Sequence, residues 1–146
     1  MKAKDYLLQL QRLDTVISQK IKELADLRTM STGVGCTDYS KDRVQTSLST
    51  DAPFAKIVNR IADLNDEINQ EIDTFTDEKH KIINQIQGLQ DSKHIDILYK
   101  RYVEFKRLEV VAVEMCYTYQ YTRELHGFAL QEFERTYKNL LKTYKA

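Results

Sequence analysis

The sequence predicts an all-α protein in which a long antiparallel helical hairpin, similar to a coiled coil, precedes a helix-turn-helix. The chain has 146 residues, the length of one domain or of a small domain with an appendage. It contains four Gly and one Pro, too few for a turn-rich β-sandwich or β-barrel. Apolar residues recur three or four positions apart over long stretches, as on one face of an amphipathic helix.

The first helix is expected from Tyr6 to about Leu27, where apolar and polar residues follow a helical period. Its apolar stripe consists of Tyr6, Leu10, Leu13, Ile17, Ile21 and Leu24. The pattern then stops. Residues from about 30 to 51 are mostly polar and include two Gly, so they are predicted to form a loop.

A second helix is expected to begin at Asp51, because an Asp followed by Pro53 is typical of a helix N-terminus. Its apolar stripe has heptad-like spacing and consists of Phe54, Ile57, Ile61, Leu64, Ile68, Ile72, Phe75, Ile82, Ile86 and Leu89. Such a helix needs a partner, and the first helix is the natural one, which gives a hairpin over residues 1–90. The rest of the stripe packs on the C-terminal region or on a second copy, and the sequence leaves both open.

A boundary is expected near residue 90, where composition and charge change. Seven of the nine Tyr lie beyond residue 93. Residues 1–92 hold 12 basic and 15 acidic side chains, a net charge of −3, whereas residues 93–146 hold 10 and 7, a net charge of +3. The second predicted domain, residues 91–146, is therefore the basic part of a chain with 22 basic and 22 acidic side chains.

Residues 91–146 have apolar positions that fit three helices, at about Ser92–Val103, Leu108–Met115 and Tyr119 to Tyr144. Two short helices followed by a longer one suit a helix-turn-helix, in which the last helix enters the major groove of DNA. This motif needs a small residue in its first helix and a small apolar core. The sequence supplies Ala112, with Val111, Met115 and Leu125 as the core and Thr118 as the N-cap of the last helix.

Three segments here resemble region 4 of the sigma-70 family: Leu98–Glu104, Leu108–Met115 and Tyr121–Leu130. The most telling parts are Arg101-Tyr102 and the run from Leu125 to Leu130. With the hairpin included, nearly the whole chain resembles a family of small prophage proteins of unassigned function from Gram-positive bacteria. That family is similar in its C-terminal half to phage late-operon transcriptional activators. The resemblance implies a promoter-binding or polymerase-recruiting regulator in the cytoplasm of a bacterial host cell.

The sequence departs from the sigma-like pattern at three places. Cys116 stands where the family usually has Gly, so we expect a positive φ or a reshaped turn there. Phe105-Lys106-Arg107-Leu108 replaces the usual Gly-Leu-Ser entry into the helix. Thr122 stands where Val or Ile normally packs.

The resemblance implies which side chains contact DNA. Those facing the groove are Thr118, Tyr119, Gln120, Arg123 and Glu124. Arg binds guanine edges, Gln binds adenine and Glu accepts from cytosine. Phosphate contacts are expected from Lys100, Lys106, Arg107 and His126. A net charge of +3 is small for a monomer on DNA, so we expect a homodimer or attachment to RNA polymerase.

Two other functions fit the same pattern. The helix-turn-helix can serve as a scaffold in a non-catalytic protein-interaction module, as in an anti-sigma or adaptor factor. Phage terminase small subunits also combine a helix-turn-helix with coiled-coil parts, and they form rings. Stacking of Tyr99 and Tyr102 on single-stranded bases is a weaker hypothesis than a place in the core.

Catalysis, metal binding and cofactor binding are not expected. Cys36 has no base positioned beside it, and the pair Glu67 and Glu71 is typical of a charged helix surface. His80 and His94 lack the spacing of metal ligands, and no Gly-rich phosphate loop occurs. The two Cys form no CxxC pair, and no export or membrane segment is apparent, so a cytoplasmic protein is expected.

Overall fold

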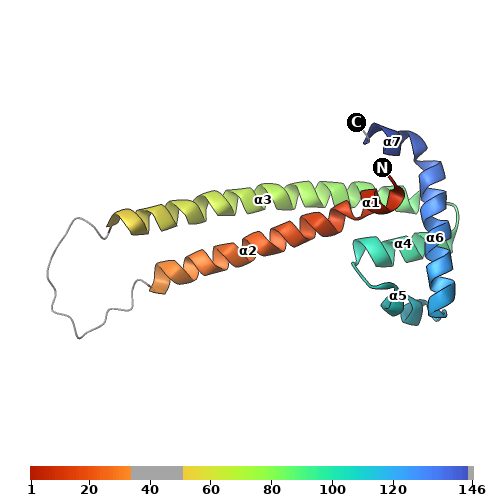
Figure 1. Ribbon diagram of the computed structural model, residues 1–146. Coiled ribbons are helices and arrows are strands. Elements are labelled where there is room, and N and C mark those ends of the chain that lie inside the picture. The colour runs from red at the N-terminus through yellow and green to blue at the C-terminus, as the bar shows by residue number, and fades with distance from the viewer. Residues whose placement is uncertain (34–50, 145–146) are drawn as a thin grey trace. The chain divides into compact units, whose positions relative to one another are not determined.

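The computed structural model describes residues 1–33 and 51–144, and every regular element in them is a helix (Figure 1). The all-α prediction is therefore confirmed for this part of the chain. The elements are α1 (Ala3–Leu7), α2 (Gln9–Gly33), α3 (Asp51–Gln87), α4 (Ser92–Leu98), a π-helical turn η1 (Tyr99–Val103), α5 (Leu108–Met115), α6 (Tyr119–Thr136) and α7 (Lys138–Thr143). None of the described helices combines the length and apolar character needed to cross a membrane.

The predicted helix boundaries are confirmed at some ends and wrong at others. Helix α3 begins at Asp51, as expected. The first helix is longer than predicted and is interrupted at Leu8, although Leu8 N–H still donates to the Lys4 carbonyl. The predicted last helix is divided at Tyr137, where φ is −112° and ψ is 30°. The predicted loop lies outside the described residues between 34 and 50, and its first residues are the end of α2.

The described chain forms two compact units. One contains Met1–Asp14 and the chain from Thr74 onward, and the other is Thr15–Asp73. Helices α2 and α3 each run from one unit into the other. This division differs from the boundary near residue 90 that composition indicates, because the start of the chain and the end of α3 supply core residues to the unit that contains the C-terminal helices.

In the Thr15–Asp73 unit, segments of α2 and α3 lie side by side (Figure 1). Leu24 packs with Leu64 and Ile68, and Leu27 and Ile61 cover this small cluster. These are the apolar positions that the helical period predicts to be buried.

Ion pairs flank this cluster. Lys20 lies 3.6 Å from Glu67 and also pairs with Glu71, and Arg60 lies 3.5 Å from Glu23. Because the earlier residue of α2 pairs with the later residues of α3, the two segments run in opposite directions.

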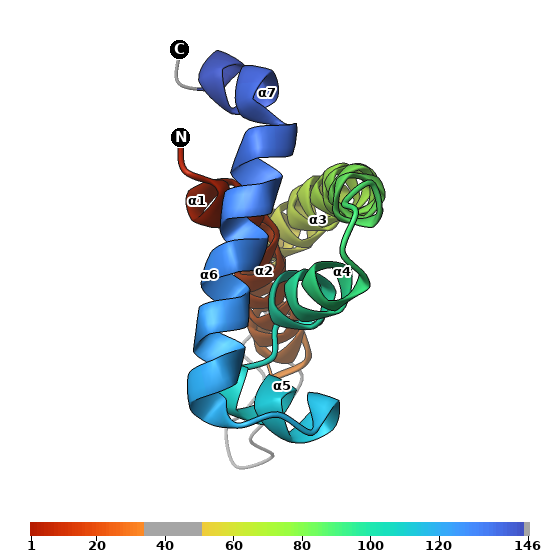
Figure 2. The ribbon, with the colours of Figure 1, turned by 90° about the vertical axis from the view of Figure 1, so that its right-hand side faces the viewer.

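In the other unit, α6 is the central element, and it packs against α1, α4, α5 and α7 (Figure 2). Its buried side chains are Thr122, Leu125, Ala129 and Phe133, which are three or four positions apart and form one stripe. The other fully buried large side chains include Tyr6, Leu7 and Leu10 near the N-terminus and Ile82 and Ile86 at the end of α3. The core is therefore built from both ends of the chain.

Buried residues of the π-helical turn extend the core from α4 toward α5. The Glu104 N–H donates to the Tyr99 carbonyl at 3.1 Å, which widens the last turn of the helix. Ile97 and Leu98 are buried, and so are Tyr102 and Val103, five positions further on. The hydrogen bonds of a π-turn join residues five apart, and both pairs of residues belong to the same core cluster.

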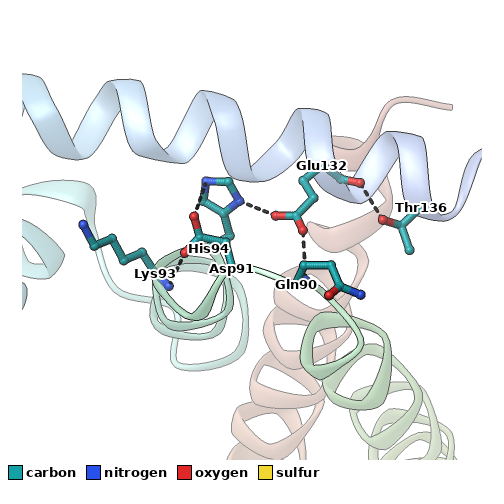
Figure 3. Close-up of polar contacts among 6 residues, drawn as sticks. All are labelled: Gln90, Asp91, Lys93, His94, Glu132 and Thr136. Carbon is teal, nitrogen blue, oxygen red and sulfur yellow. Dashed lines mark hydrogen bonds and ion pairs between the residues drawn. The ribbon is translucent and has the colours of Figure 1, made fainter.

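Polar contacts join the start of α4 to α6 (Figure 3). The His94 ring pairs with Glu132, and the other Glu132 oxygen accepts from the Gln90 N–H at 2.9 Å. The hydrogen bond from His94 is the main reason that the pKa of Glu132 is lowered. Asp91 caps α4 by accepting from the Lys93 N–H at 2.9 Å. These contacts satisfy polar groups where α3 ends and α4 begins.

Gly88 is required by a close approach at the end of α3. The Tyr137 hydroxyl donates to the Gln85 carbonyl at 2.7 Å. A Cβ at position 88 would lie 2.6 Å from that hydroxyl, which is too close for two heavy atoms. The absence of a side chain at Gly88 therefore allows Tyr137 to bond to the last turn of α3.

The burial of α6 predicts different effects for its two Phe residues. Phe133 is fully buried, whereas Phe128 is 57% exposed. Phe133→Ala is expected to lower the free energy of unfolding by about 3 to 5 kcal/mol through lost burial and the cavity left behind. Phe128→Ala on the same helix is expected to change it by less than about 0.5 kcal/mol. Urea denaturation followed by circular dichroism measures both, and equal losses would contradict this core.

Candidate nucleic-acid interface

The segment from α5 to α6 contains a tight left-handed turn at Cys116. Cys116 has φ of 59° and ψ of 38°, so the positive φ expected there is confirmed. The Tyr117 N–H donates to the Ala112 carbonyl at 2.9 Å and the Cys116 N–H donates to the Val113 carbonyl at 3.2 Å. This is the hydrogen-bonding pattern of a Schellman motif, which ends a helix sharply and redirects the chain.

Thr118 starts α6 as an N-cap, as the sequence predicts. Its backbone is extended, and its hydroxyl accepts from the Tyr121 N–H at 3.2 Å. Thr122 is fully buried, and its hydroxyl donates to the Thr118 carbonyl at 2.9 Å. This bond satisfies a polar group at a position that is apolar in the family the sequence resembles.

The small core predicted between these two helices is present. Val111 is fully buried, and Ala112 and Leu125 are 4% and 5% exposed. Met115 is half-buried against the same cluster. The small side chain of Ala112 therefore lies at a packed position.

The five predicted base-contacting residues are brought together at the start of α6. Thr118, Tyr119, Gln120, Arg123 and Glu124 are all exposed. The Arg123 guanidinium lies 5.8 Å from the centre of the Tyr119 ring, and Gln120, Arg123 and Glu124 line a shallow hollow. The first turns of α6 thus present donors and acceptors of the kinds that bind base edges.

A second hollow lies beside this surface. It is lined by Arg101, Arg107, Leu108, Glu109 and Tyr119. Arg107, a predicted phosphate contact, therefore lies near the start of α6. Arg101 was not predicted as a contact residue. It follows Lys100 in a basic pair, and the two side chains differ in their contacts, since Arg101 lines this hollow and Lys100 pairs with Glu114.

The other two predicted phosphate-contacting lysines are ion-paired with acidic residues. Lys106 Nζ lies 2.7 Å from Glu114 Oε1 and 2.9 Å from Glu104 Oε2, and Lys100 Nζ lies 3.0 Å from Glu114 Oε2. Hydrogen bonds to Glu114 and Glu104 raise the pKa of Lys106, and hydrogen bonds from both lysines lower the pKa of Glu114. Two carboxylates therefore offset the charge of these lysines.

His126, the fourth predicted phosphate contact, is packed against Tyr102. A hydrogen bond of 2.8 Å joins its Nε2 to the Tyr102 hydroxyl, and the two rings stack with centres 5.6 Å apart. Burial, with smaller effects from Arg101 and Lys4, lowers the pKa of His126 to about 4. His126 is therefore uncharged at neutral pH and brings no positive charge to a phosphate. Tyr102 is 2% exposed, which places it in the core and not in a stacking surface for single-stranded bases.

Other residues considered for chemistry have structural contacts. His94 lies between Asp91 and Glu132, and the His80 ring is hydrogen-bonded to the Asn84 amide at 3.2 Å. In the part of the chain that the structure describes, no three His, Cys, Asp or Glu residues are grouped to hold a metal ion. Cys36 lies outside the described residues.

Comparison with known proteins gives no relative from which a function can be read. No family model matches the chain, and neither a curated protein nor a solved structure does.

The buried His126 predicts a pH dependence of stability. The pKa of His126 is about 4 in the folded protein and 6.5 ordinarily, so below pH 6.5 the unfolded chain takes up a proton that the folded chain does not. The free energy of unfolding should therefore fall between pH 6.5 and pH 4. His126→Gln should weaken this fall, whereas His80→Gln, at an exposed position, should not. Denaturant titrations at pH 7 and pH 5 test this, and equal pH slopes in all three proteins would contradict it.

Proposed function

We propose that this protein is a DNA-binding transcription regulator of a bacteriophage or prophage, and that α5 and α6 act as a helix-turn-helix that reads a promoter element. The observation that carries the proposal is the exposed start of α6. Five polar or aromatic side chains are exposed there, while the buried side of the same helix packs against α5. In such motifs the N-terminal residues of the second helix contact base edges in the major groove. The protein would act in the cytoplasm of the host cell.

The roles of individual residues follow from their surroundings. Arg123 is held near Tyr119 and next to Gln120 and Glu124, so it is the best candidate for a bidentate contact with guanine. Arg101 and Arg107, around the neighbouring hollow, are placed to contact the phosphate backbone. Lys100 and Lys106 would have to exchange Glu114 for a phosphate.

This arrangement favours two sources of additional affinity. The C-terminal region has a net charge of only +3, and part of that charge is offset by internal ion pairs. A homodimer doubles the number of phosphate contacts, and attachment to RNA polymerase supplies protein contacts. We therefore propose that residues 1–90 form a hairpin that joins two copies or docks a polymerase subunit.

A second candidate function is a non-catalytic protein-interaction module of the anti-sigma or adaptor kind. It is favoured by two apolar side chains on α5, Val113 at 78% exposed and Val110 at 46% exposed. Exposed apolar residues close together are typical of protein-binding surfaces. A terminase-small-subunit-like protein is a third candidate, and a ring of subunits would distinguish it from a dimer.

Sequence-specific binding is expected to depend on Arg123. A selection from a random double-stranded DNA library at near-physiological salt, followed by titration of the best site, tests this. Arg123→Ala should weaken binding to that site by about 1 to 3 kcal/mol and relax one base position. Lys106→Ala should lower affinity for all sequences and flatten the dependence on salt. Arg135→Ala, in the last turn of α6, is the matched control and should retain the selected sequence.

Two results would overturn this division of roles. Equal losses on all sequences from Arg123→Ala and Lys106→Ala would show that neither residue reads bases. If no sequence is enriched and only weak, salt-sensitive binding remains, the protein-interaction module becomes the better proposal.

Glu114 is expected to weaken DNA binding in the natural protein. Glu114→Gln removes the carboxylate shared by Lys100 and Lys106, which frees the Lys100 ammonium for a phosphate and leaves Lys106 with its pair to Glu104. Affinity for non-specific DNA should rise, and the slope of log affinity against log salt should steepen by about one to two. Asp96→Asn makes the same change of charge at an exposed position on α4 and should have a smaller effect. An unchanged slope in Glu114→Gln would show that these lysines do not contact DNA.

A further inference from the structure

Helix α3 presents two parallel seams of side chains in the Thr15–Asp73 unit. The first seam, which includes Ile61, Leu64 and Ile68, faces α2. The second seam lies one residue further along at each position and consists of Ala55, Val58, Ala62, Asn65, Asn69 and Ile72. Its spacing alternates between three and four over the whole length, which is a heptad pattern. We call this second set the uncharged seam.

The uncharged seam is exposed in the single chain. All six of its residues are exposed, with Val58 at 45% and Ile72 at 40%. None of the six carries a charge, although 30% of all residues in the chain are charged. A surface position on such a helix is ordinarily filled by Lys, Glu, Asp or Arg, so a seam without any of them over this length points to a packed surface.

An ion pair shows which side of the two-helix unit carries this seam. Arg60 and Glu23 each precede a residue of the buried cluster, Ile61 and Leu24, and they pair at 3.5 Å. In an α-helix each residue is rotated by about 100° from the one before it. In two antiparallel helices, the residues just before the buried positions therefore point to one face of the pair. The residues just after the buried positions point to the opposite face. The ion-paired side and the uncharged side are therefore opposite faces of the unit.

Helix α2 continues the uncharged side. Ile21 and Ala25, one step on from Lys20 and Leu24, fall on the same side as the uncharged seam by this geometry, and Ile21 is 48% exposed. Arg28, one step on from Leu27, falls on this side as well, so the side has apolar side chains on both helices together with the Arg28 cation of α2. A second pair of helices packed on this side would enclose these side chains in the core of a four-helix bundle.

We propose that a second copy of this chain covers the uncharged side, with the two uncharged seams packed against each other in parallel. A second copy fits because the seam is self-complementary. It carries no charge that would repel its own copy, and an Asn amide both donates and accepts, so Asn65 and Asn69 can pair with themselves across a twofold axis. Asn at core positions of a coiled coil is a known means of fixing register and the number of helices. This inference rests on the homodimer proposed above and names the surface through which it forms, and because association is measured without DNA, its failure is distinguishable from a failure of DNA binding.

The test is the molar mass of the full-length protein in solution. Sedimentation equilibrium over a range of concentrations should give a dimer, with twice the 17.2 kDa of one chain. Asn65→Asp places two like charges at the centre of the dimer and should weaken association by on the order of a hundredfold. Asn59→Asp is the matched control, because Asn59 is exposed on α3 outside the seam, and it should remain dimeric.

The variants keep the single chain intact, since the side chains they change are exposed in it, and circular dichroism checks that the helices are retained. Asn65→Val replaces the polar pair with an apolar one and should strengthen association or raise the number of subunits. A monomer at every concentration would overturn the proposal. So would equal association of Asn65→Asp and Asn59→Asp, which would place the dimer contact elsewhere. DNA binding is absent from this measurement, so either result leaves the proposed function to its own test.

Discussion

The unit that contains the C-terminal helices depends on one constraint. A single apolar stripe on α6 must pack against four neighbouring helices. Thr122 and Leu125 are buried near the start of α6, and Ala129 and Phe133 are buried further along it. The same helix packs against α5, α4, α1 and α7. Because one stripe is used in this way, the other side of α6 is left for polar side chains. The exposed cluster at its start is thus a consequence of how the core is built.

Helix α5 is held between two strained residues. Phe105, just before α5, has φ of 58°, and Cys116, just after it, has φ of 59°. These are the positive φ values among non-Gly residues of the described chain, and each costs on the order of 1 kcal/mol or more. Val111 and Ala112 offset that cost by packing into the core, as does Phe105 itself. A helix of eight residues with both ends bent sharply is kept in a fixed relation to α6 without needing Gly in either turn.

The sequence predicts well the features that depend on periodicity and local chemistry. Helical spacing places Leu64 and Ile68 in a core, and the capping chemistry of Thr118 marks the start of α6. At Cys116, where the resembled pattern has Gly, the sequence allows a positive φ or a reshaped turn, and the structure has the positive φ. The break at Tyr137 was missed because the apolar period continues through it. What fixes Tyr137 is a hydrogen bond to the distant Gln85, and a one-dimensional pattern contains no trace of that contact.

The candidate site shows the same limit more clearly. The exposed residues of α6 could be predicted because their exposure follows from the helical period. The roles of the basic residues could not, because they depend on which neighbours they meet. Lys106 meets Glu114, and His126 meets Tyr102, and both partners come from other elements. Arg101 lines the hollow beside α6, and it lies in a π-helical turn that no sequence period indicates.

Each of the two units has its own distribution of charge. In the proposed DNA-binding surface carboxylates offset Lys100 and Lys106, which makes Arg123, Arg107 and Arg101 the cations proposed to contact DNA. A few cations on one copy give weak, salt-sensitive binding, and two copies on one duplex give twice as many contacts at a fixed spacing. In the two-helix unit Arg60 and Glu23 pair on one side, and the six residues of the uncharged seam on the opposite side carry no charge. Under the two proposals, internal ion pairs limit the affinity of one copy for DNA and the uncharged seam joins two copies, so that firm binding requires both copies together.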